Sequence, residues 1–189
     1  YVFHDDDTFI VMHRLLALLT WYDSWLDPMN EVVAIGRHIH GGSVGKKRTV
    51  YADQPYVLRT TKMGYLQGGQ GMVYSNALMR RMDDRWLKCM VHSDEDTCLG
   101  RCLHDNNVTM LHDQAFYCER FKPGFWDTLS EQSEGEILRQ TGARVSLHAI
   151  YTPQEYNTLY KIFYSSRPAD CTLSGAPRTN RTKARGHGR

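Results

Sequence analysis

Short apolar runs alternate with amphipathic segments along this chain, and this alternation constrains the fold more than any other feature. Residues 32–35, 108–111 and 144–150 have the composition of buried strands. Residues 8–25 repeat apolar side chains at helical spacing, and a last helix is expected at 152–164. Strands that alternate with helices predict an α/β fold.

Local signals predict further elements and boundaries. Asp7 or Thr8 is expected to cap the helix at residues 8–25. Thr152 and Glu155 predict a capping box for the last helix, with Pro153 at its first position. We also expect a strand at residues 1–4, a loop at 38–54, and helices at 72–82 and 94–105.

Length and charge exclude several classes of protein. The chain has 189 residues, of which 41% are hydrophobic and 23% charged, and this composition argues against wholesale disorder. Residues 167–189 carry a net charge of +5, whereas the rest of the chain carries −3. We therefore expect a disordered basic tail at 167–189. Since no basic stripe continues into the body, no nucleic-acid partner is expected.

Three acidic residues, Asp5, Asp6 and Asp7, directly follow the first apolar run. Carboxylates two apart at a strand end suit a hard divalent cation such as Mn²⁺ or Mg²⁺, which in turn binds a diphosphate. Acidic residues ahead of a helix are equally explained by its dipole. The triplet alone leaves both interpretations open.

Three other segments bear residues suited to catalysis or binding. Gly68-Gly69-Gln70-Gly71 permits close approach of the backbone to a ligand, although a plain tight turn explains it as well. Asp96 suits a general base, but Ser93 and Asp96 also match a capping box. His148 lies between apolar neighbours, where a core histidine is the simpler interpretation.

The cysteines and two N-glycosylation sequons indicate the cellular compartment in which the chain folds. The five cysteines suggest one or two disulfides in a secreted chain, and a zinc site formed by Cys98, Cys102 and His104 is the alternative. Sequons for N-glycosylation begin at Asn107 and Asn180 and agree with the secretory route.

Five segments in a fixed order resemble the inverting β1,3-glycosyltransferases of the fringe and core 1 galactosyltransferase group. They are HDDDTF, AIGRHI, GYLQGGQGMVYSNAL, SDEDTCLGRCL and VSLHAIYTPQEY, within residues 1–164. The resemblance implies a GT-A type fold, a Rossmann-like mixed sheet flanked by helices. It also implies that residues 1–166 are the C-terminal part of a catalytic domain truncated at the Asp-x-Asp motif, and that this fragment alone is inactive.

The same resemblance implies a role for each matching residue. Asp96 is the expected catalytic base, with Glu95 as the alternative beside it. Asp5 and Asp7 would hold Mn²⁺ or Mg²⁺ together with His148. The expected donor-sugar and nucleotide contacts are Asp5, Asp6, Gly68, Gly69, Gly71 and Glu95. Cys89 and Cys102 match family cysteines and form the expected disulfide.

The implied activity is β1,3 transfer of a sugar, with galactose from UDP-galactose as the first choice and GalNAc-Ser/Thr as the acceptor. The implied location is the lumen of the Golgi or endoplasmic reticulum, in a type II membrane protein that forms a homodimer. Gln70 stands where the family has a small residue, which puts the donor pocket in doubt. The alternatives are a fringe-type transferase that uses UDP-GlcNAc, and a silent relative that acts as a folding partner.

Overall fold

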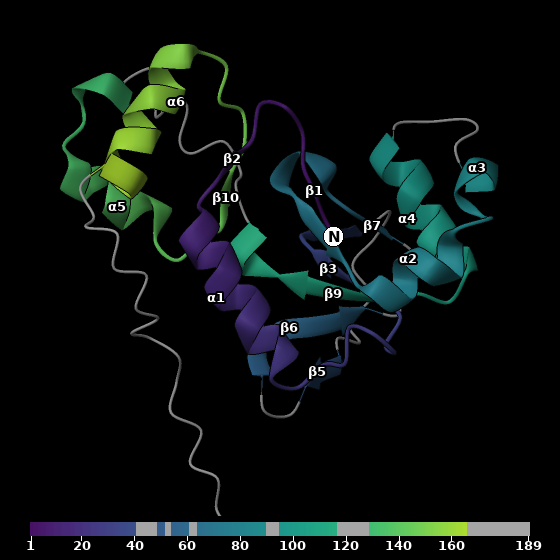
Figure 1. Cartoon of the computed structure of the whole chain (residues 1–189). Coiled ribbons are helices and arrows are strands. Elements are labelled where there is room, and N and C mark those ends of the chain that lie inside the picture. Colours follow the sequence, from purple (N-terminus) through teal and green to yellow (C-terminus); the bar gives the residue numbers. More distant parts are fainter. Residues whose placement is uncertain (41–48, 52–53, 61–63, 90–94, 117–128, 166–189) are drawn as a thin grey trace, which may run out of the picture.

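A computed structural model describes residues 1–40, 49–51, 54–60, 64–89, 95–116 and 129–165 (Figure 1). The predicted basic tail therefore lies outside the described residues.

The strands are β1 (Val2–Phe3), β2 (Phe9–Ile10), β3 (Val33–Gly36), β4 (His38–His40), β5 (Thr49–Tyr51), β6 (Gln54–Thr60), β7 (Gly64–Leu66), β8 (Met72–Tyr74), β9 (Thr109–Asp113) and β10 (Ser146–Leu147). The helices are α1 (Met12–Asp23), α2 (Asn76–Met82), α3 (Trp86–Cys89), α4 (Glu95–Asp105), α5 (Glu134–Thr141) and α6 (Pro153–Tyr160). Short 3₁₀ turns at Gly68–Gln70, Gln114–Phe116 and Leu129–Glu131, and a π-helical turn at Lys161–Ser165, complete the described elements.

A six-stranded mixed sheet forms the centre, in the order β1-β8-β3-β9-β6-β5. Only the β3–β9 pair in this sheet is parallel among the described strands, and the other neighbours are antiparallel. Two antiparallel pairs, β2–β10 and β4–β7, stand apart from it. A mixed sheet with helices on both faces matches the α/β fold that the sequence predicts (Figure 1).

The two faces of the sheet bury different side chains, because successive residues of a strand point to opposite faces. On one face, Ile35 of β3 packs with Leu15 and Tyr22 of α1. On the other face, Ala34 of β3 packs with residues of α2 and α4. Helices therefore cover both faces of the sheet, as Figure 1 shows.

A third apolar cluster covers the β2–β10 pair. Phe9 of β2 and Leu147 of β10 are fully buried against Ile137 of α5 and Leu159 of α6. The hydroxyl of Tyr164, beyond α6, donates to the Ile10 carbonyl at 2.8 Å and accepts from the Met12 N–H at 2.6 Å. The C-terminal helices thus fix the strand that follows the acidic triplet. None of the helices in the described ranges is long and apolar enough to span a bilayer.

Several predicted boundaries are wrong, and tertiary pairing explains the differences. The first residues of the predicted helix at 72–82 form β8 instead, because they pair with both β1 and β3. The helix α2 begins only after them, where the Ser75 hydroxyl accepts a hydrogen bond from the Leu78 N–H and caps it. The predicted helix at 8–25 begins as β2, which pairs with β10. The predicted loop at 38–54 contains β4 and β5, and the predicted strand at 144–150 shortens to β10. The predicted capping box of Thr152 and Glu155 is present.

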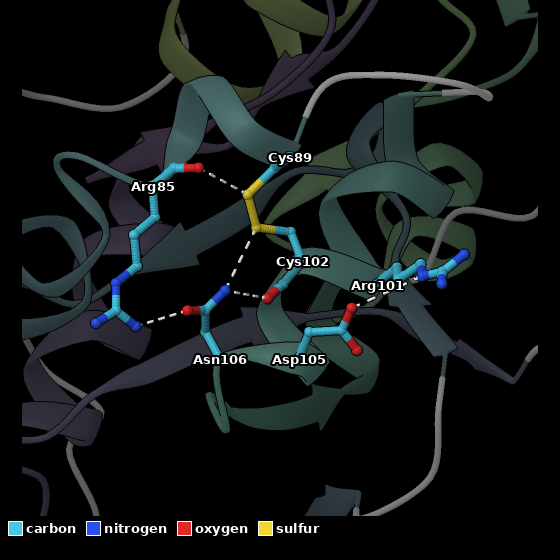
Figure 2. Close-up of a disulfide and its surroundings, with 6 residues drawn as sticks. All are labelled: Arg85, Cys89, Arg101, Cys102, Asp105 and Asn106. Atoms are coloured by element: carbon cyan, nitrogen blue, oxygen red, sulfur yellow. Dashed lines mark hydrogen bonds and ion pairs between the residues drawn. A yellow bond between two sulfur atoms is a disulfide. The ribbon is translucent and has the colours of Figure 1, made fainter.

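A disulfide joins Cys89 of α3 to Cys102 of α4 (Figure 2). This is the pair that the family resemblance implies. It also corrects the zinc alternative, because Cys102 is bonded to sulfur and has no thiolate for a metal. Among the described cysteines, Cys98 is the one that takes no part in this disulfide.

Removing this disulfide is expected to lower the free energy of unfolding by about 3 kcal/mol, because a crosslink over 13 residues restricts the unfolded chain. Urea unfolding of a Cys89→Ser variant measures the loss. The matched control is Cys98→Ser, which keeps the disulfide and is expected to retain most of the stability. Equal losses in the two variants would contradict a stabilising role for the disulfide.

Candidate functional site

The acidic triplet lies in the turn between β1 and β2. The Thr8 N–H donates to the Asp5 carbonyl at 3.2 Å and closes this turn. The N-cap position of α1 is Val11, with no side-chain hydrogen bond. The predicted capping role of Asp7 or Thr8 is therefore wrong, because β2 separates both residues from the helix.

His148 reaches the triplet because β10 pairs with β2. The register places Leu147 opposite Phe9, so the next residue, His148, stands opposite Thr8 and beside Asp7. Ala149 has a φ of +66°, in the left-handed region that side chains rarely adopt, at a cost of about 1–3 kcal/mol. Beyond this bend, the Ile150 N–H donates to the Asp7 carbonyl at 2.9 Å. The bend and this hydrogen bond hold His148 at the triplet.

Asp5, Asp7 and His148 present three ligand atoms that lie within 4.8 Å of one another. Nε2 of His148 is 3.2 Å from Oδ1 of Asp7 and 3.9 Å from Oδ2 of Asp5. Oδ1 of Asp7 is buried and, apart from this close approach of His148, it has no hydrogen-bond partner in the described part of the chain. A buried carboxylate oxygen without a hydrogen bond is costly unless a cation neutralises it.

This group of side chains has the donor types of a divalent-cation site. Two carboxylates are hard oxygen ligands that suit Mg²⁺ and Mn²⁺, and an imidazole nitrogen suits the transition metals. Asp6 is exposed and lies outside the three-residue cluster. The residues present therefore fit a divalent cation, and Asp5, Asp7 and His148 are the side chains that could hold it.

The glycine segment forms a tight turn beside this cluster. Gly68–Gln70 is a 3₁₀ turn, and Gly71 follows with a φ of +85°. The Thr8 hydroxyl donates to the Gly69 carbonyl at 2.7 Å, and the Ser146 hydroxyl donates to the Gln70 carbonyl. Thr8 immediately follows Asp7, and Ser146 is two residues before His148. The segment that carries Asp7 and the segment that carries His148 are thus attached to the same glycine turn.

The glycines are needed because side chains approach their α-carbons closely. A Cβ atom at Gly69 would lie 2.7 Å from Cε1 of His148, and it would overlap Nε2 as well. A Cβ atom at Gly68 would overlap Oδ1 of Asp96. The close approach of His148 and Asp96 therefore explains Gly68 and Gly69 from contacts within the chain.

Asp96 reaches the glycine turn because α4 packs directly on β7. A Cβ atom at Gly100 of α4 would lie 2.5 Å from the Gly64 carbonyl oxygen of β7, so this glycine permits the close contact. Asp96 lies in the first turn of α4, and its Oδ1 accepts the Gly68 N–H at 2.9 Å. Two consecutive residues of one turn, Gly68 and Gly69, therefore contact Asp96 and His148.

The surroundings of Asp96 raise its pKa. Burial is the main cause, and the negative charges of Asp5 and Glu95 add to it. The hydrogen bond from the Gly68 N–H and the charge of His148 act in the opposite direction. A half-buried carboxylate with a raised pKa accepts a proton more readily than an exposed one, as a general base requires.

Some predicted residues lie beside the site without a contact that defines their role. Glu95 is exposed, at the start of α4. Gly71 has a conformation that favours glycine, in contact range of Phe116. Ser93, the other half of the alternative capping box, lies outside the described residues.

Sequence reasoning missed three side chains that shape the site. The hydroxyls of Thr8 and Ser146 hold the glycine turn, and the only signal in the sequence is a small polar residue next to the apolar residues of a strand. Tyr74 is buried against Trp86 with its ring stacked, and among the described residues its hydroxyl has no hydrogen-bond partner. Burial raises the pKa of Tyr74, and the charges of Asp96 and Glu95 raise it further. Tyr74 therefore stays neutral beside the acidic residues.

Gln70 is buried and contacts another side chain of the protein. It is 1% exposed, and its Oε1 accepts from Nη1 of Arg37 at 3.3 Å. The side chain therefore points into the protein and contributes to the shape of the turn through Arg37.

Comparison with known proteins identifies the family of this chain. The fringe-like family model matches residues 1–149, which include Asp5, Asp7, Asp96 and His148. The beta-1,3-glucosyltransferases of Homo sapiens and Mus musculus are each 31% identical to the chain over 117 residues. This match covers 61% of the chain and 20% of each relative, so the chain spans about a fifth of the length of these curated relatives. The chain belongs to the fringe-like family of glycosyltransferases.

Proposed function

We propose that this chain bears the metal ligands and the general base of an inverting β1,3-glycosyltransferase that takes a hexose from a nucleotide sugar. One observation supports this function above all. The Asp5–Asp7–His148 cluster and the Asp96 carboxylate are brought together by Gly68 and Gly69. A site for a diphosphate-binding cation beside a proton acceptor is well suited to single-displacement sugar transfer.

The proposed cofactor is Mn²⁺, with Mg²⁺ as the second choice. Asp5, Asp7 and His148 would hold it, because their ligand atoms already converge and Oδ1 of Asp7 accepts no hydrogen bond from the described residues. A bound cation supplies positive charge that offsets the charge of the departing diphosphate.

Asp96 is the proposed general base. As the acceptor hydroxyl oxygen bonds to the anomeric carbon, its proton passes to the Asp96 carboxylate, and the bond from that carbon to the diphosphate oxygen breaks. The Gly68 N–H fixes one carboxylate oxygen during this step. A single displacement inverts the anomeric centre, so an α-linked donor gives a β-linked product. Asp6, Glu95 and the three glycines are proposed donor contacts.

We propose glucose as the donor sugar. The sequence resemblance favours galactose, and the relatives that the chain matches are named as glucosyltransferases. Those relatives share 31% identity over the aligned segment, so we rank their sugar first. The proposed acceptor is a glycan or glycoprotein in the lumen of the Golgi or endoplasmic reticulum, since fringe-like glycosyltransferases act in the secretory pathway.

Donor hydrolysis by the natural full-length protein tests the function. UDP-glucose, UDP-galactose and UDP-GlcNAc are each incubated with Mn²⁺, and release of UDP is measured with and without EDTA. We expect Mn²⁺-dependent release that is fastest with UDP-glucose. Faster release from UDP-galactose would overturn the choice of sugar. Absence of both UDP release and UDP binding would overturn the enzymatic function and favour a silent relative.

A Glu95→Gln variant is expected to shift the acidic limb of the pH–rate profile to lower pH. The Glu95 charge raises the pKa of Asp96, so removing it lowers that pKa and leaves Asp96 ionised in more acidic solution. Because Glu95 is exposed, we expect a shift below about one pH unit in kcat/KM. Glu134→Gln, in the first turn of α5, is the matched control and is expected to leave the limb in place.

The outcome also separates the two candidate bases. A shift with a nearly normal kcat supports Asp96 as the base, while loss of the proposed donor contact of Glu95 would raise only KM. A loss of the maximal rate by orders of magnitude would assign the base to Glu95 instead.

A further inference from the structure

The sequon Asn107-Val108-Thr109 lies in the turn that joins α4 to β9. This turn is at the C-terminal end of α4, whereas Asp96 lies in the first turn of the same helix. An 11-residue helix is about 16 Å long, so the two ends are well separated. A group attached at Asn107 therefore leaves the candidate catalytic residues accessible.

The backbone of Asn107 presents its side chain to solvent. Asn107 is exposed, with a φ of +54° in the left-handed region, which asparagine adopts more readily than most residues. Its N–H donates to the His104 carbonyl at 2.9 Å, and this hydrogen bond closes the turn. In the described part of the chain, the Asn107 side-chain amide makes no hydrogen bond.

The preceding residue, Asn106, has the opposite role (Figure 2). Its Nδ2 donates to the Cys102 carbonyl at 2.9 Å, and its Oδ1 accepts from Nη1 of Arg85 at 2.6 Å. Asn106 thus attaches the turn to the disulfide-linked helices α3 and α4. The fold uses the amide of Asn106 and leaves the amide of Asn107 in solvent.

The rest of the sequon becomes part of the sheet on folding. Val108 is buried, and Thr109 begins β9 opposite Val33 of β3. A transferase can read Thr109 only before this strand pairs, whereas the folded protein needs only space around residue 107. The Cys89–Cys102 disulfide independently indicates an oxidising compartment such as the endoplasmic reticulum.

We propose that Asn107 carries an N-linked glycan, attached during synthesis in the endoplasmic reticulum. The co-reactant is an oligosaccharide linked to a lipid diphosphate. A bond forms between Nδ2 of Asn107 and the anomeric carbon of the first sugar, while the bond from that carbon to the phosphate oxygen breaks. The amide loses one proton, and the lipid diphosphate leaves. This proposal depends on compartment and exposure, and it stands independently of the glycosyltransferase activity.

The test is expression of the natural full-length protein in cultured eukaryotic cells with Asn180→Gln in the background, which removes the second sequon of this chain. Peptide N-glycosidase F converts a glycosylated asparagine to aspartate, so mass spectrometry of the peptide that contains residue 107 identifies the site. We expect this conversion at residue 107 in most of the folded protein. An unmodified Asn107 peptide in folded protein would overturn the proposal.

Two pairs of variants separate glycosylation from folding. Thr109→Ala destroys the sequon and Thr109→Ser keeps it, so the glycan is expected to be lost in the first and retained in the second. Asn107→Asp removes the acceptor amide and keeps a side chain that tolerates a positive φ, so this variant is expected to lose the glycan. Asn106→Gln keeps the sequon intact and is expected to retain it. Loss of the glycan in Thr109→Ser, or its retention in Thr109→Ala, would contradict the assignment.

Discussion

Replacing Asp96 with Asn is expected to lower the rate of sugar transfer by about 10²–10⁴-fold, the contribution typical of a positioned general base. Asparagine has nearly the same shape, and its side-chain oxygen still accepts the Gly68 N–H that Asp96 accepts at 2.9 Å. The glycine turn and the Asp5–Asp7–His148 cluster are therefore expected to keep their arrangement. What the variant lacks is a group that accepts a proton from the acceptor hydroxyl.

The measurement combines transfer kinetics with donor binding in the natural full-length protein. We expect kcat to fall while the affinity for the UDP-sugar and the free energy of unfolding change little. Asp84→Asn, an exposed residue after α2, is the matched control and is expected to transfer normally. Asp96→Ala provides a further comparison, because it also leaves the Gly68 N–H without its acceptor.

Two outcomes would contradict the role of Asp96. Nearly normal turnover in Asp96→Asn would exclude the residue as the base. Equal loss of transfer and of donor binding would assign it a structural role, since a proton acceptor acts in the transition state and contributes little to ground-state binding.

The local features of this fold could be predicted from sequence, and the features that depend on distant pairing could not. The capping box of Thr152 and Glu155 lies within four residues, so its signal is complete in the sequence. Met72–Tyr74 contains no comparable signal, because it becomes a strand only between β1 and β3. Tertiary pairing overrides the local helical pattern there.

The candidate site shows the same division. Asp5 and Asp7 are close in sequence, and residue chemistry alone marks them as candidate cation ligands, with helix capping as the alternative until the structure separates them from α1. From its neighbours alone His148 looks like a core histidine. Only the family resemblance implies a ligand there, and the pairing of β10 with β2 is what brings it to Asp7. Thr8 and Ser146 hold carbonyls that are 61 and 76 residues away, so only the folded chain reveals their role.

A Gly69→Ala variant is expected to weaken Mn²⁺ binding by about 10–100-fold, the range typical when the support of a metal ligand is lost. A methyl group at this position would overlap the imidazole of His148, with Cε1 only 2.7 Å away. The ring must rotate away from Asp7, whose Oδ1 now lies 3.2 Å from Nε2. The fold itself should persist, because the side chain that moves is 26% exposed.

Titration of the natural full-length protein with Mn²⁺ alone measures this loss without any sugar transfer. The matched control is Gly135→Ala in α5, where an added Cβ has no atom within 4 Å. That control is expected to keep the Mn²⁺ affinity and to gain about 0.5–1 kcal/mol of stability from the helix propensity of alanine. Gly68→Ala is expected to act differently, because its methyl group would displace Asp96 and so lower transfer with little change in Mn²⁺ affinity. If Gly69→Ala binds Mn²⁺ as tightly as the natural protein, His148 is not a ligand, since its ring cannot keep its place beside that methyl group.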